Sequence, residues 1–347
     1  MELRLILLGF GAVARSFSTI TSIRSEAIKR KYGASIKFVA VADRGGVAVS
    51  EAGLDPLKLA SVKKLRGSVS AVPELGKPGI TPPELFEMVE AEILVDATSS
   101  NLEDGEPSLT YIHRALTDGL DVITANKGAI SRGLRKLRAA ASSHGTMLLY
   151  EATVGGGTPI LSFARDLELK EGITSIRGVL NGTTNYILWR MGEGLTLEEA
   201  LVEARKLGYT EKNYSYDIEG LDTACKLTII ANSIFNENIE LEDVHIRGIE
   251  DLTPEDLRRA GRKGRSIRLI GSLDRSGAAE VKPSEIPKKD HLCVDSVNNA
   301  VEVATEFGEY FLIGEGAGGQ AAACSLIRDL AALIRERLKA VEALPSP

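Results

Sequence analysis

Short apolar segments alternate with longer amphipathic segments through the first 150 residues of the chain. Residues 3–8 are apolar apart from Arg4, and residues 12–31 repeat apolar positions at helical spacing. Further strand candidates are 36–42, 93–96, 122–124 and 147–150, and further helical segments are 109–120 and 134–142. Continuous apolar strands separated by helices indicate a parallel sheet that is covered on both faces. We therefore predict an α/β fold whose first domain is a doubly wound, Rossmann-type parallel sheet.

The alternation becomes less regular after residue 150, which predicts a second, α+β domain. Its strand candidates are 173–180, 266–273 and 280–281, and its most apolar helical segment is 221–235. A glycine-rich turn at 314–319 then leads into a long helical segment, as at the start of the first domain. We therefore expect the C-terminus to return there. The expected domains are a dinucleotide-binding domain of residues 1–150 with 305–347 and a substrate-binding domain of residues 151–304.

Composition excludes several classes of protein. A net charge of −6 and a pI near 5.5 give no electrostatic reason to expect binding to nucleic acid or to an anionic membrane. No apolar segment of the sequence reaches the roughly 18 residues of a membrane span. Cys225, Cys293 and Cys324 are too far apart to suggest a disulfide framework or a thiolate zinc site, a pattern typical of the reducing cytoplasm. The basic run 258–265 contains no aromatic residue, so we expect a solvated loop.

The first apolar segment ends in Gly9-Phe10-Gly11-Ala12-Val13-Ala14, and a helical segment follows directly. This is a dinucleotide-binding fingerprint with alanine in its third glycine position. Gly9 permits a tight turn, Gly11 lets a pyrophosphate approach the backbone, and the N–H groups of the helix N-terminus attract its negative charge. The alternative is an ordinary strand-to-helix turn. The N-terminal position and the flanking periodicity favour the dinucleotide interpretation.

Polar residues follow three later strand candidates. After the second strand, Asp43 suits the ribose hydroxyls of NAD, and Arg44 suits the 2′-phosphate of NADP. Having both leaves the preference open, with Arg44 slightly favouring NADP. Thr98, Ser99 and Lys127 follow other strands, at the edge where open α/β sheets bind ligands. Taken alone, each of these three fits a structural role better.

Three consecutive glycines, 155–157, come shortly after Glu151. Glycines let the backbone curl so that carbonyl oxygens can point inward beside the carboxylate. A ligand set of oxygen atoms alone suits a hard cation such as Na⁺ and does not suit zinc. A flexible hinge between domains explains the same run equally well, so both interpretations stay open.

The most informative polar cluster lies within residues 208–226. It contains Glu211, Asp217 and Asp222, and Lys226 follows Asp222 by four residues, so a helix would place these two on one face. An exposed ion pair is the alternative. The segment continues with apolar residues, however, which is unusual for a solvated face. Acidic residues beside a lysine suit recognition of an amino group together with proton transfer.

Taken together, these motifs resemble the homoserine dehydrogenase family over nearly the whole chain. The motifs that carry the resemblance are the fingerprint, Asn126-Lys127, the run 151–159, the block Asn181-Gly182-Thr183-Thr184-Asn185, the segment 208–226 and the glycines of 314–318. Family members interconvert L-aspartate 4-semialdehyde and L-homoserine with NAD(P)(H), in threonine and methionine biosynthesis. Ala14 and residues 212–216 depart from the family pattern. Nothing matches the C-terminal regulatory domain of some relatives, so we expect no feedback inhibition through such a domain.

The resemblance implies a role for each candidate residue. Lys226 would exchange the proton with the substrate oxygen, and Glu211 and Asp222, supported by Asp217, would bind the amino and hydroxyl ends of homoserine. A sodium site is implied at Glu151, Val154, Gly156 and Thr158. The implied cofactor contacts are Gly9, Phe10, Gly11, Ala12, Val13, Arg44, Thr98, Ser99, Lys127, Gly208 and Gly318. The family also implies a homodimer built on the sheet of the second domain.

The mechanism that we expect is hydride transfer between the nicotinamide and the aldehyde carbon, with Lys226 as the proton donor. A free lysine has a pKa of about 10.4, so oxidation of homoserine needs that pKa lowered by burial or by a cation such as Lys127, an effect that Asp222 would oppose. Lys226 must also face the nicotinamide across the gap between the domains. The alternatives are a dehydrogenase acting directly on aspartate, which the block 181–185 argues against, and a non-catalytic NAD(P) sensor, which the intact lysine and acids argue against.

Overall fold

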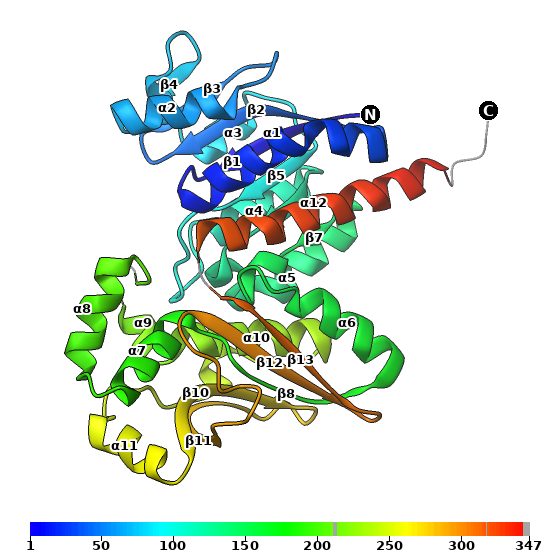
Figure 1. Cartoon of the computed structure of the whole chain (residues 1–347). Coiled ribbons are helices and arrows are strands. Elements are labelled where there is room, and N and C mark those ends of the chain that lie inside the picture. The colour runs from blue at the N-terminus through cyan, green and yellow to red at the C-terminus, as the bar shows by residue number, and fades with distance from the viewer. Residues whose placement is uncertain (211–213, 317, 343–347) are drawn as a thin grey trace. The chain divides into compact units, whose positions relative to one another are not determined.

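The computed structural model describes residues 1–210, 214–316 and 318–342 and divides into two compact units. Unit 1 is Met1–Ala152 together with the chain from Ala322 onward, and unit 2 is Thr153–Ala321. We expected the second domain to end at residue 304. It extends further because residues 309–315 form a strand of its own sheet (Figure 1). Within the described ranges, no helix has the length and apolar character needed to cross a membrane.

Unit 1 is built on a seven-stranded sheet. Its strands are β1 (Glu2–Leu8), β2 (Ser35–Asp43), β3 (Gly46–Val49), β4 (Gly76–Pro78), β5 (Ile93–Asp96), β6 (Asp121–Thr124) and β7 (Leu148–Leu149). They lie in the order β4-β3-β2-β1-β5-β6-β7, and β2, β1, β5, β6 and β7 are parallel. Strand β3 pairs antiparallel with β2, and β4 pairs antiparallel with β3. The predicted Rossmann-type fold is confirmed. The strand order reverses at β1, between β2 and β5, and sheets of this type bind ligands at the carboxyl ends of the strands at that point.

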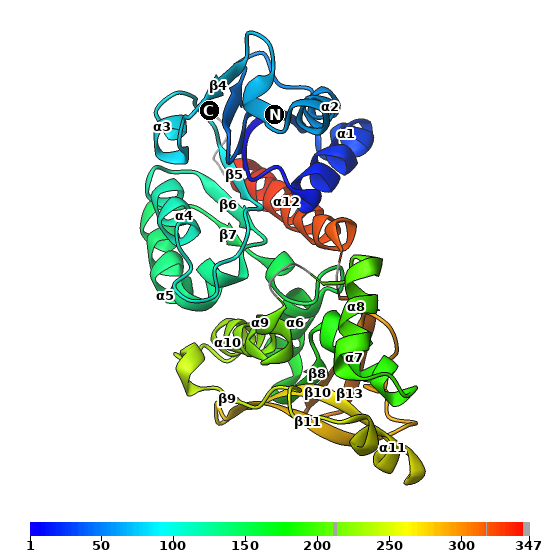
Figure 2. The same ribbon diagram turned by 90° about the vertical axis from the view of Figure 1, so that its left-hand side faces the viewer.

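Helices cover both faces of this sheet. They are α1 (Ala12–Tyr32), α2 (Pro56–Arg66), α3 (Pro82–Phe86), α4 (Ser108–Thr117), α5 (Lys127–His144) and α12 (Gly319–Glu342). In Figure 2, α1, α2 and α12 lie on one side of the sheet, and α3, α4 and α5 lie on the other. Leu326, Leu330 and Leu333 of α12 are buried in one apolar cluster with Leu5 of β1 and Phe17 of α1. The last helix of the chain therefore completes the core of the N-terminal unit.

Unit 2 contains a six-stranded sheet in the order β13-β12-β8-β10-β11-β9. Its strands are β8 (Ile173–Val179), β9 (His245–Ile246), β10 (Arg265–Asp274), β11 (Ala279–Pro287), β12 (Asn298–Thr305) and β13 (Glu309–Glu315). Its helices are α6 (Ile160–Glu171), α7 (Gly182–Gly192), α8 (Leu197–Leu207), α9 (Ser215–Ile218), α10 (Leu221–Ile234) and α11 (Pro254–Arg262). Helices α6, α7 and α10 cover one face (Figure 2). The packing of α10 is close, because a Cβ at Gly271 of β10 would lie 2.9 Å from the Thr223 side chain.

The other face of this sheet carries charged and apolar side chains together. Arg177 of β8 and Glu302 of β12 are partners in the strand register and form a two-pronged ion pair at 2.7 and 2.8 Å. On the edge strand β13, Phe311 and Ile313 point to the same face and are 38% and 54% exposed. In most native proteins, an exposed apolar edge strand of this kind is covered by another element or another chain.

The basic run 258–265 is not the loop that we expected, because most of it lies in α11. Arg258 and Arg262 both pair with Glu255, at spacings that a helix brings onto one side. Thr253 caps the helix by accepting a hydrogen bond from the backbone N–H three residues later. Arg258, Arg259 and Arg262 are exposed, so this part of the run is solvated as predicted, but the predicted loop conformation was wrong.

Candidate active site

The turn from β1 into α1 has the conformation that a dinucleotide requires. Gly9 has a φ of +79°, and a Cβ there would lie 2.6 Å from the carbonyl oxygen of Ala97, so only glycine fits. A Cβ at Gly11 would meet nothing within 4 Å, which leaves space beside the N-terminus of α1. In the part of the chain that the structure describes, no side chain caps that N-terminus, and its first turn has no acidic residue, which favours an anion there. These features fit the pyrophosphate of NAD(P).

A hydrogen-bond network fixes the loops that follow β5 and β6. Asp96 accepts bonds from the backbone N–H of Thr98 at 3.0 Å and from its hydroxyl at 2.6 Å. The Asn126 amide donates to the hydroxyls of Thr98 at 3.1 Å and Ser108 at 2.9 Å, and its oxygen caps α5. Complete burial raises the pKa of Asp96, although these hydrogen bonds oppose the shift. The network sets the positions of Thr98 and of Lys127, the first residue of α5.

Asp43, at the end of β2, is fully engaged within unit 1. Its oxygens accept hydrogen bonds from Lys63 Nζ at 2.8 Å, from Ser68 Oγ at 2.7 Å and from two backbone N–H groups. Burial alone would raise the pKa of Asp43, but these donors, led by Lys63, lower it overall. Four donors match the roughly four lone-pair positions of a carboxylate. Asp43 is therefore poorly suited to accept a further bond from a ribose hydroxyl, whereas Arg44 beside it is exposed.

In unit 2, the beginning of α10 carries the predicted ion pair. Lys226 Nζ lies 2.6 Å from Asp222 Oδ2, and the two residues are only 6% and 4% exposed. Their four-residue spacing places them on one face of the helix, and the first turn is a favourable position for the carboxylate of Asp222. Removing two charges from water costs free energy that an ordinary surface pair does not incur. The exposed ion pair that we considered as the alternative is therefore wrong.

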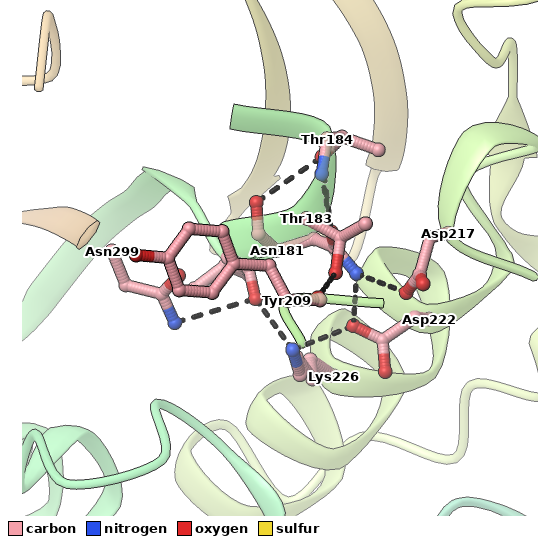
Figure 3. Close-up of polar contacts among 9 residues, drawn as sticks. Asn181, Thr183, Thr184, Tyr209, Asp217, Asp222, Lys226 and Asn299 are labelled. Carbon is pink, nitrogen blue, oxygen red and sulfur yellow. Dashed lines mark hydrogen bonds and ion pairs between the residues drawn. The ribbon is translucent and has the colours of Figure 1, made fainter. Parts of the chain in front are cut away.

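The junction between β8 and α7 supplies hydrogen-bond partners to both members of this pair (Figure 3). The Asn181 amide nitrogen donates to Asp222 Oδ2 at 2.8 Å and to Asp217 Oδ1 at 2.6 Å. The carbonyl oxygen of Leu180 accepts a hydrogen bond from Lys226 Nζ. Residues from the strand end, from α9 and from α10 thus converge on one buried polar cluster.

Three further contacts surround this cluster. The Thr183 hydroxyl donates to the carbonyl oxygen of Tyr209 at 2.8 Å, which ties the residue after Gly208 to α7. The ring of Tyr209 packs edge-on against Tyr186, with 5.1 Å between the ring centroids. The Asn299 amide reaches the same Leu180 carbonyl oxygen at 3.4 Å (Figure 3). These contacts hold the beginning of α7 and the end of α8 beside the ion pair.

The glycine run predicted as a cation site follows a tight path. Gly155 and Gly156 have φ values of +79° and +57°. Thr158 is buried, and its hydroxyl oxygen has no hydrogen-bond partner in the described part of the chain. Among those residues, no group of three or more His, Cys, Asp or Glu side chains could hold a metal ion. Backbone carbonyls and a hydroxyl oxygen are chemically suited to a hard monovalent cation.

The structure places most predicted cofactor contacts in unit 1 and the predicted substrate residues in unit 2. At the carboxyl edge of the first sheet lie Gly9, Phe10, Gly11, Ala12, Val13, Arg44, Thr98, Ser99 and Lys127. Phe10 is 1% exposed and belongs to the apolar core of unit 1. Gly208 and Gly318 belong to unit 2, where both have positive φ values. Glu211 lies outside the described residues.

Sequence reasoning missed the residues that hold the candidate side chains in place. Asn126 and Asn181 each cap the helix that follows, and a capping signal could have identified both of them. Their amide bonds to Ser108, Asp217 and Asp222 join residues distant in the chain. No local pattern in the sequence predicts such contacts.

Comparison with known proteins also assigns cofactor binding to the first part of the chain. Residues 9–151 match the family model "Homoserine dehydrogenase, NAD binding domain", and residues 159–331 match the model "Homoserine dehydrogenase". The homoserine dehydrogenase of Methanocaldococcus jannaschii is 38% identical over 328 residues, which cover 94% of this chain and 97% of that protein. This chain belongs to the homoserine dehydrogenase family.

Other homoserine dehydrogenases match over a similar length. The NAD(+)-dependent homoserine dehydrogenase of Pseudomonas canavaninivorans is 33% identical, with 95% of each chain covered. The solved structure of a hyperthermophilic archaeal homoserine dehydrogenase in complex with NADPH is 30% identical, with a TM-score of 0.85, and the match covers 97% of this chain and 98% of that one. The predicted family, fold and reaction class are confirmed. The chain is an NAD(P)-dependent oxidoreductase of the homoserine dehydrogenase type.

Proposed function

We propose that this chain interconverts L-aspartate 4-semialdehyde and L-homoserine, with Lys226 exchanging the proton at the substrate oxygen. The observation that supports this role most is the buried Asp222–Lys226 pair at the start of α10. A lysine in a dry, polar cluster can stabilise an alkoxide, and the neighbouring carboxylates can attract an ammonium group. The reaction would serve threonine and methionine biosynthesis, as the family resemblance implies.

In this proposal Lys226 transfers one proton and stabilises the negative charge that develops on the substrate oxygen. A bound NAD(P)H supplies the hydride that adds to the aldehyde carbon. Protonated Lys226 gives its proton to the oxygen as negative charge develops there, and the neutral amine then regains a proton from solvent. In the oxidising direction, the neutral amine of Lys226 removes the hydroxyl proton. Burial of Lys226 strengthens the attraction between the ammonium and the developing alkoxide, because little water screens it.

We propose that the acidic residues orient the substrate. Asp222 lies 2.6 Å from Lys226 Nζ, so a hydroxyl at the lysine would also be near this carboxylate. Asp217 shares a donor with Asp222 and supports it. The amino group of homoserine is assigned to Glu211 by motif alone. A substrate with one cationic end and one hydroxyl end matches this set of acids and lysine.

The test of Lys226 separates chemistry from binding. Lys226→Ala should lower kcat by about 10²- to 10⁴-fold while the dissociation constant of NADPH stays within about threefold. Lys206→Ala, which removes an exposed lysine of α8, is the matched control and should keep wild-type kcat. Initial rates of NADPH oxidation with aspartate semialdehyde and a fluorescence titration of NADPH give both quantities. Near-normal turnover in Lys226→Ala would remove Lys226 from the mechanism.

For the cofactor we propose a preference for NADP(H). NAD recognition needs a carboxylate acceptor at the end of the second strand, and the Asp43 oxygens are already engaged by four donors. Arg44 is exposed and can meet a 2′-phosphate. The relatives include one named as NAD(+)-dependent and one solved with NADPH, so NAD is the second candidate.

We also propose that Na⁺ binds through oxygen atoms of Glu151, Val154, Gly156 and Thr158. Support comes from the positive φ at Gly156, which turns the backbone sharply, and from the buried Thr158 hydroxyl that has no partner in the described chain. Such oxygen ligands suit a cation with modest charge. The role proposed for the ion is to fix the backbone around the glycine run.

We propose that the chain forms a homodimer through the outer face of the unit 2 sheet. Phe311 and Ile313 expose apolar surface on the edge strand β13. Exposed apolar edge strands are usually covered in native proteins. A second copy of this chain is the proposed partner, as the family resemblance implies.

A further inference from the structure

The side chain of Asn181 contacts both acidic residues of the candidate substrate site. Its amide nitrogen donates to Asp217 Oδ1 at 2.6 Å and to Asp222 Oδ2 at 2.8 Å. Its amide oxygen accepts from the backbone N–H of Thr184 at 2.8 Å. Figure 3 shows the amide between the two carboxylates. The orientation of the amide is unambiguous, because the reverse arrangement would place its oxygen against two carboxylates.

The backbone next to Asn181 contacts the other member of the ion pair. The carbonyl oxygen of Leu180 accepts a hydrogen bond from Lys226 Nζ, while the amide of the following residue donates to Asp222. Two consecutive residues at the end of β8 therefore hold the ammonium and the carboxylate from one point of the chain. Asn181 is 5% exposed, so water competes little for these bonds.

We propose that Asn181 is a positioning residue, which holds Asp217 and Asp222 together and thereby sets the orientation of Asp222 and Lys226 for proton transfer. This inference rests on the proposed function. Two neighbouring carboxylates repel each other, and an amide donates one N–H to each without adding a second positive charge beside Lys226. Because the amide is uncharged, it does not compete with Lys226 for the negative charge on the substrate oxygen. Within the described ranges, the charged groups that contact Asn181 are Asp217 of α9 and, on α10, Asp222 with its partner Lys226.

Asn181 has a second task, because its oxygen caps α7. Two variants keep this cap and remove the bridge. Asn181→Ser retains a capping oxygen but is too short to reach the carboxylates, and Asn181→Asp retains the cap but replaces the donor by a third carboxylate. The matched control is Asn185→Ser. Asn185 is also buried in α7. Its amide donates to the backbone carbonyl oxygens of Val294, Ser296 and Asn298, and these bonds do not involve Asp217 or Asp222.

The experiment measures homoserine oxidation against pH, the KM of homoserine and NADP, and thermal unfolding for the wild type and the three variants. Asn181→Ser should lower kcat/KM for homoserine about 10- to 100-fold and leave the KM of NADP within about twofold. Asn181→Asp should move the acid limb of the kcat profile to higher pH, because added negative charge keeps Lys226 protonated. Asn185→Ser should lower the melting temperature without moving the pH profile.

The outcomes distinguish this inference from the proposed function. Wild-type protein that does not oxidise homoserine overturns the proposed function and this inference with it. Active wild type, with Asn181→Ser within threefold in kcat/KM and Asn181→Asp unshifted in its profile, overturns the positioning role alone. Failure of both Asn181 variants to fold also overturns it, because the residue would then act as a structural element of α7 and β8.

Discussion

Alanine substitutions at Gly9 and Gly11 should impair different properties, stability at Gly9 and NADPH binding at Gly11, although only one residue separates the two glycines. At Gly9, a Cβ would lie 2.6, 2.8 and 2.9 Å from backbone atoms of Ala97 and Thr98, and alanine would have to keep a φ of +79°. The left-handed conformation costs about 1–2 kcal/mol. An atom forced into a packed interior costs about 1–3 kcal/mol more. Gly9→Ala should therefore lower the free energy of unfolding by about 2–5 kcal/mol.

At Gly11 the same methyl group would meet no protein atom within 4 Å, and the backbone φ of −78° suits alanine. The free energy of unfolding should therefore change by less than about 0.5 kcal/mol. The methyl would occupy the space where a pyrophosphate approaches the N-terminus of α1. Loss of one charge-assisted hydrogen bond to that group would weaken NADPH binding about 10- to 100-fold.

Thermal unfolding without cofactor and fluorescence titration with NADPH test both expectations on the same samples. At about 2–4 °C per kcal/mol, Gly9→Ala should lower the melting temperature by about 4–20 °C. Gly11→Ala should melt within about 2 °C of the wild type and bind NADPH weakly. A Gly9→Ala protein as stable as the wild type, or a Gly11→Ala protein with wild-type NADPH affinity, would refute this reasoning.

Four further measurements test the remaining proposals. The pKa of Asp43 is lowered in the folded protein, so the stability that it contributes is present above the ordinary value of 3.8 and is lost as the pH falls through the lower folded value. The difference in unfolding free energy between the wild type and Asp43→Asn should therefore shrink at low pH. A difference that does not change with pH would contradict this assignment. Arg44→Ala should raise the KM of NADPH about 10- to 100-fold and leave that of NADH within about twofold, and equal changes for both would remove Arg44 from phosphate recognition. Replacing NaCl by choline chloride at equal ionic strength should lower the melting temperature if oxygen atoms near Thr158 hold Na⁺, and an unchanged melting temperature would count against the site. Ile313→Asp should halve the mass measured by sedimentation, whereas Leu169→Asp, at an 86% exposed position of α6, should not; an unchanged mass would place any dimer contact elsewhere.

The sequence pattern predicted unit 1 better than unit 2, for a physical reason. Strands of a parallel sheet covered on both faces are apolar throughout, so segments such as 93–96 stand out from the helices between them. Strand β13 also contains a continuous apolar run, residues 310–313, with Phe311 and Ile313 on the outer face and Leu312 on the inner one. The glycine-rich turn and the helix that follow it led us to assign residues 305–347 to the first domain, so this strand was not predicted.

In the candidate site, too, some features could be predicted from the sequence and others could not. The four-residue spacing of Asp222 and Lys226 is a local signal, and the helix that it predicted is present. The bonds of Asn181 to Asp217 and Asp222 span 36 and 41 residues, so they depend on the packing of β8, α9 and α10. The saturation of Asp43 likewise depends on α2 and the turn that follows it. Sequence reasoning identified the chemical groups, and tertiary packing determines which of them remain available to a ligand.

The return of α12 to unit 1 has a consequence for biosynthesis of the chain itself. The ribosome must translate the whole of unit 2 before Leu326 and Leu330 emerge to cover the strands made first. At about 5–20 residues per second, this delay lasts about 10–30 s. During that interval the nascent N-terminal segment exposes apolar surface, whereas Thr153–Ala321 forms a compact unit without any later part of the chain. We expect a chain that is truncated after Ala321 and released from the ribosome to be cleaved by protease first within residues 1–152, and the reverse order of cleavage would contradict this.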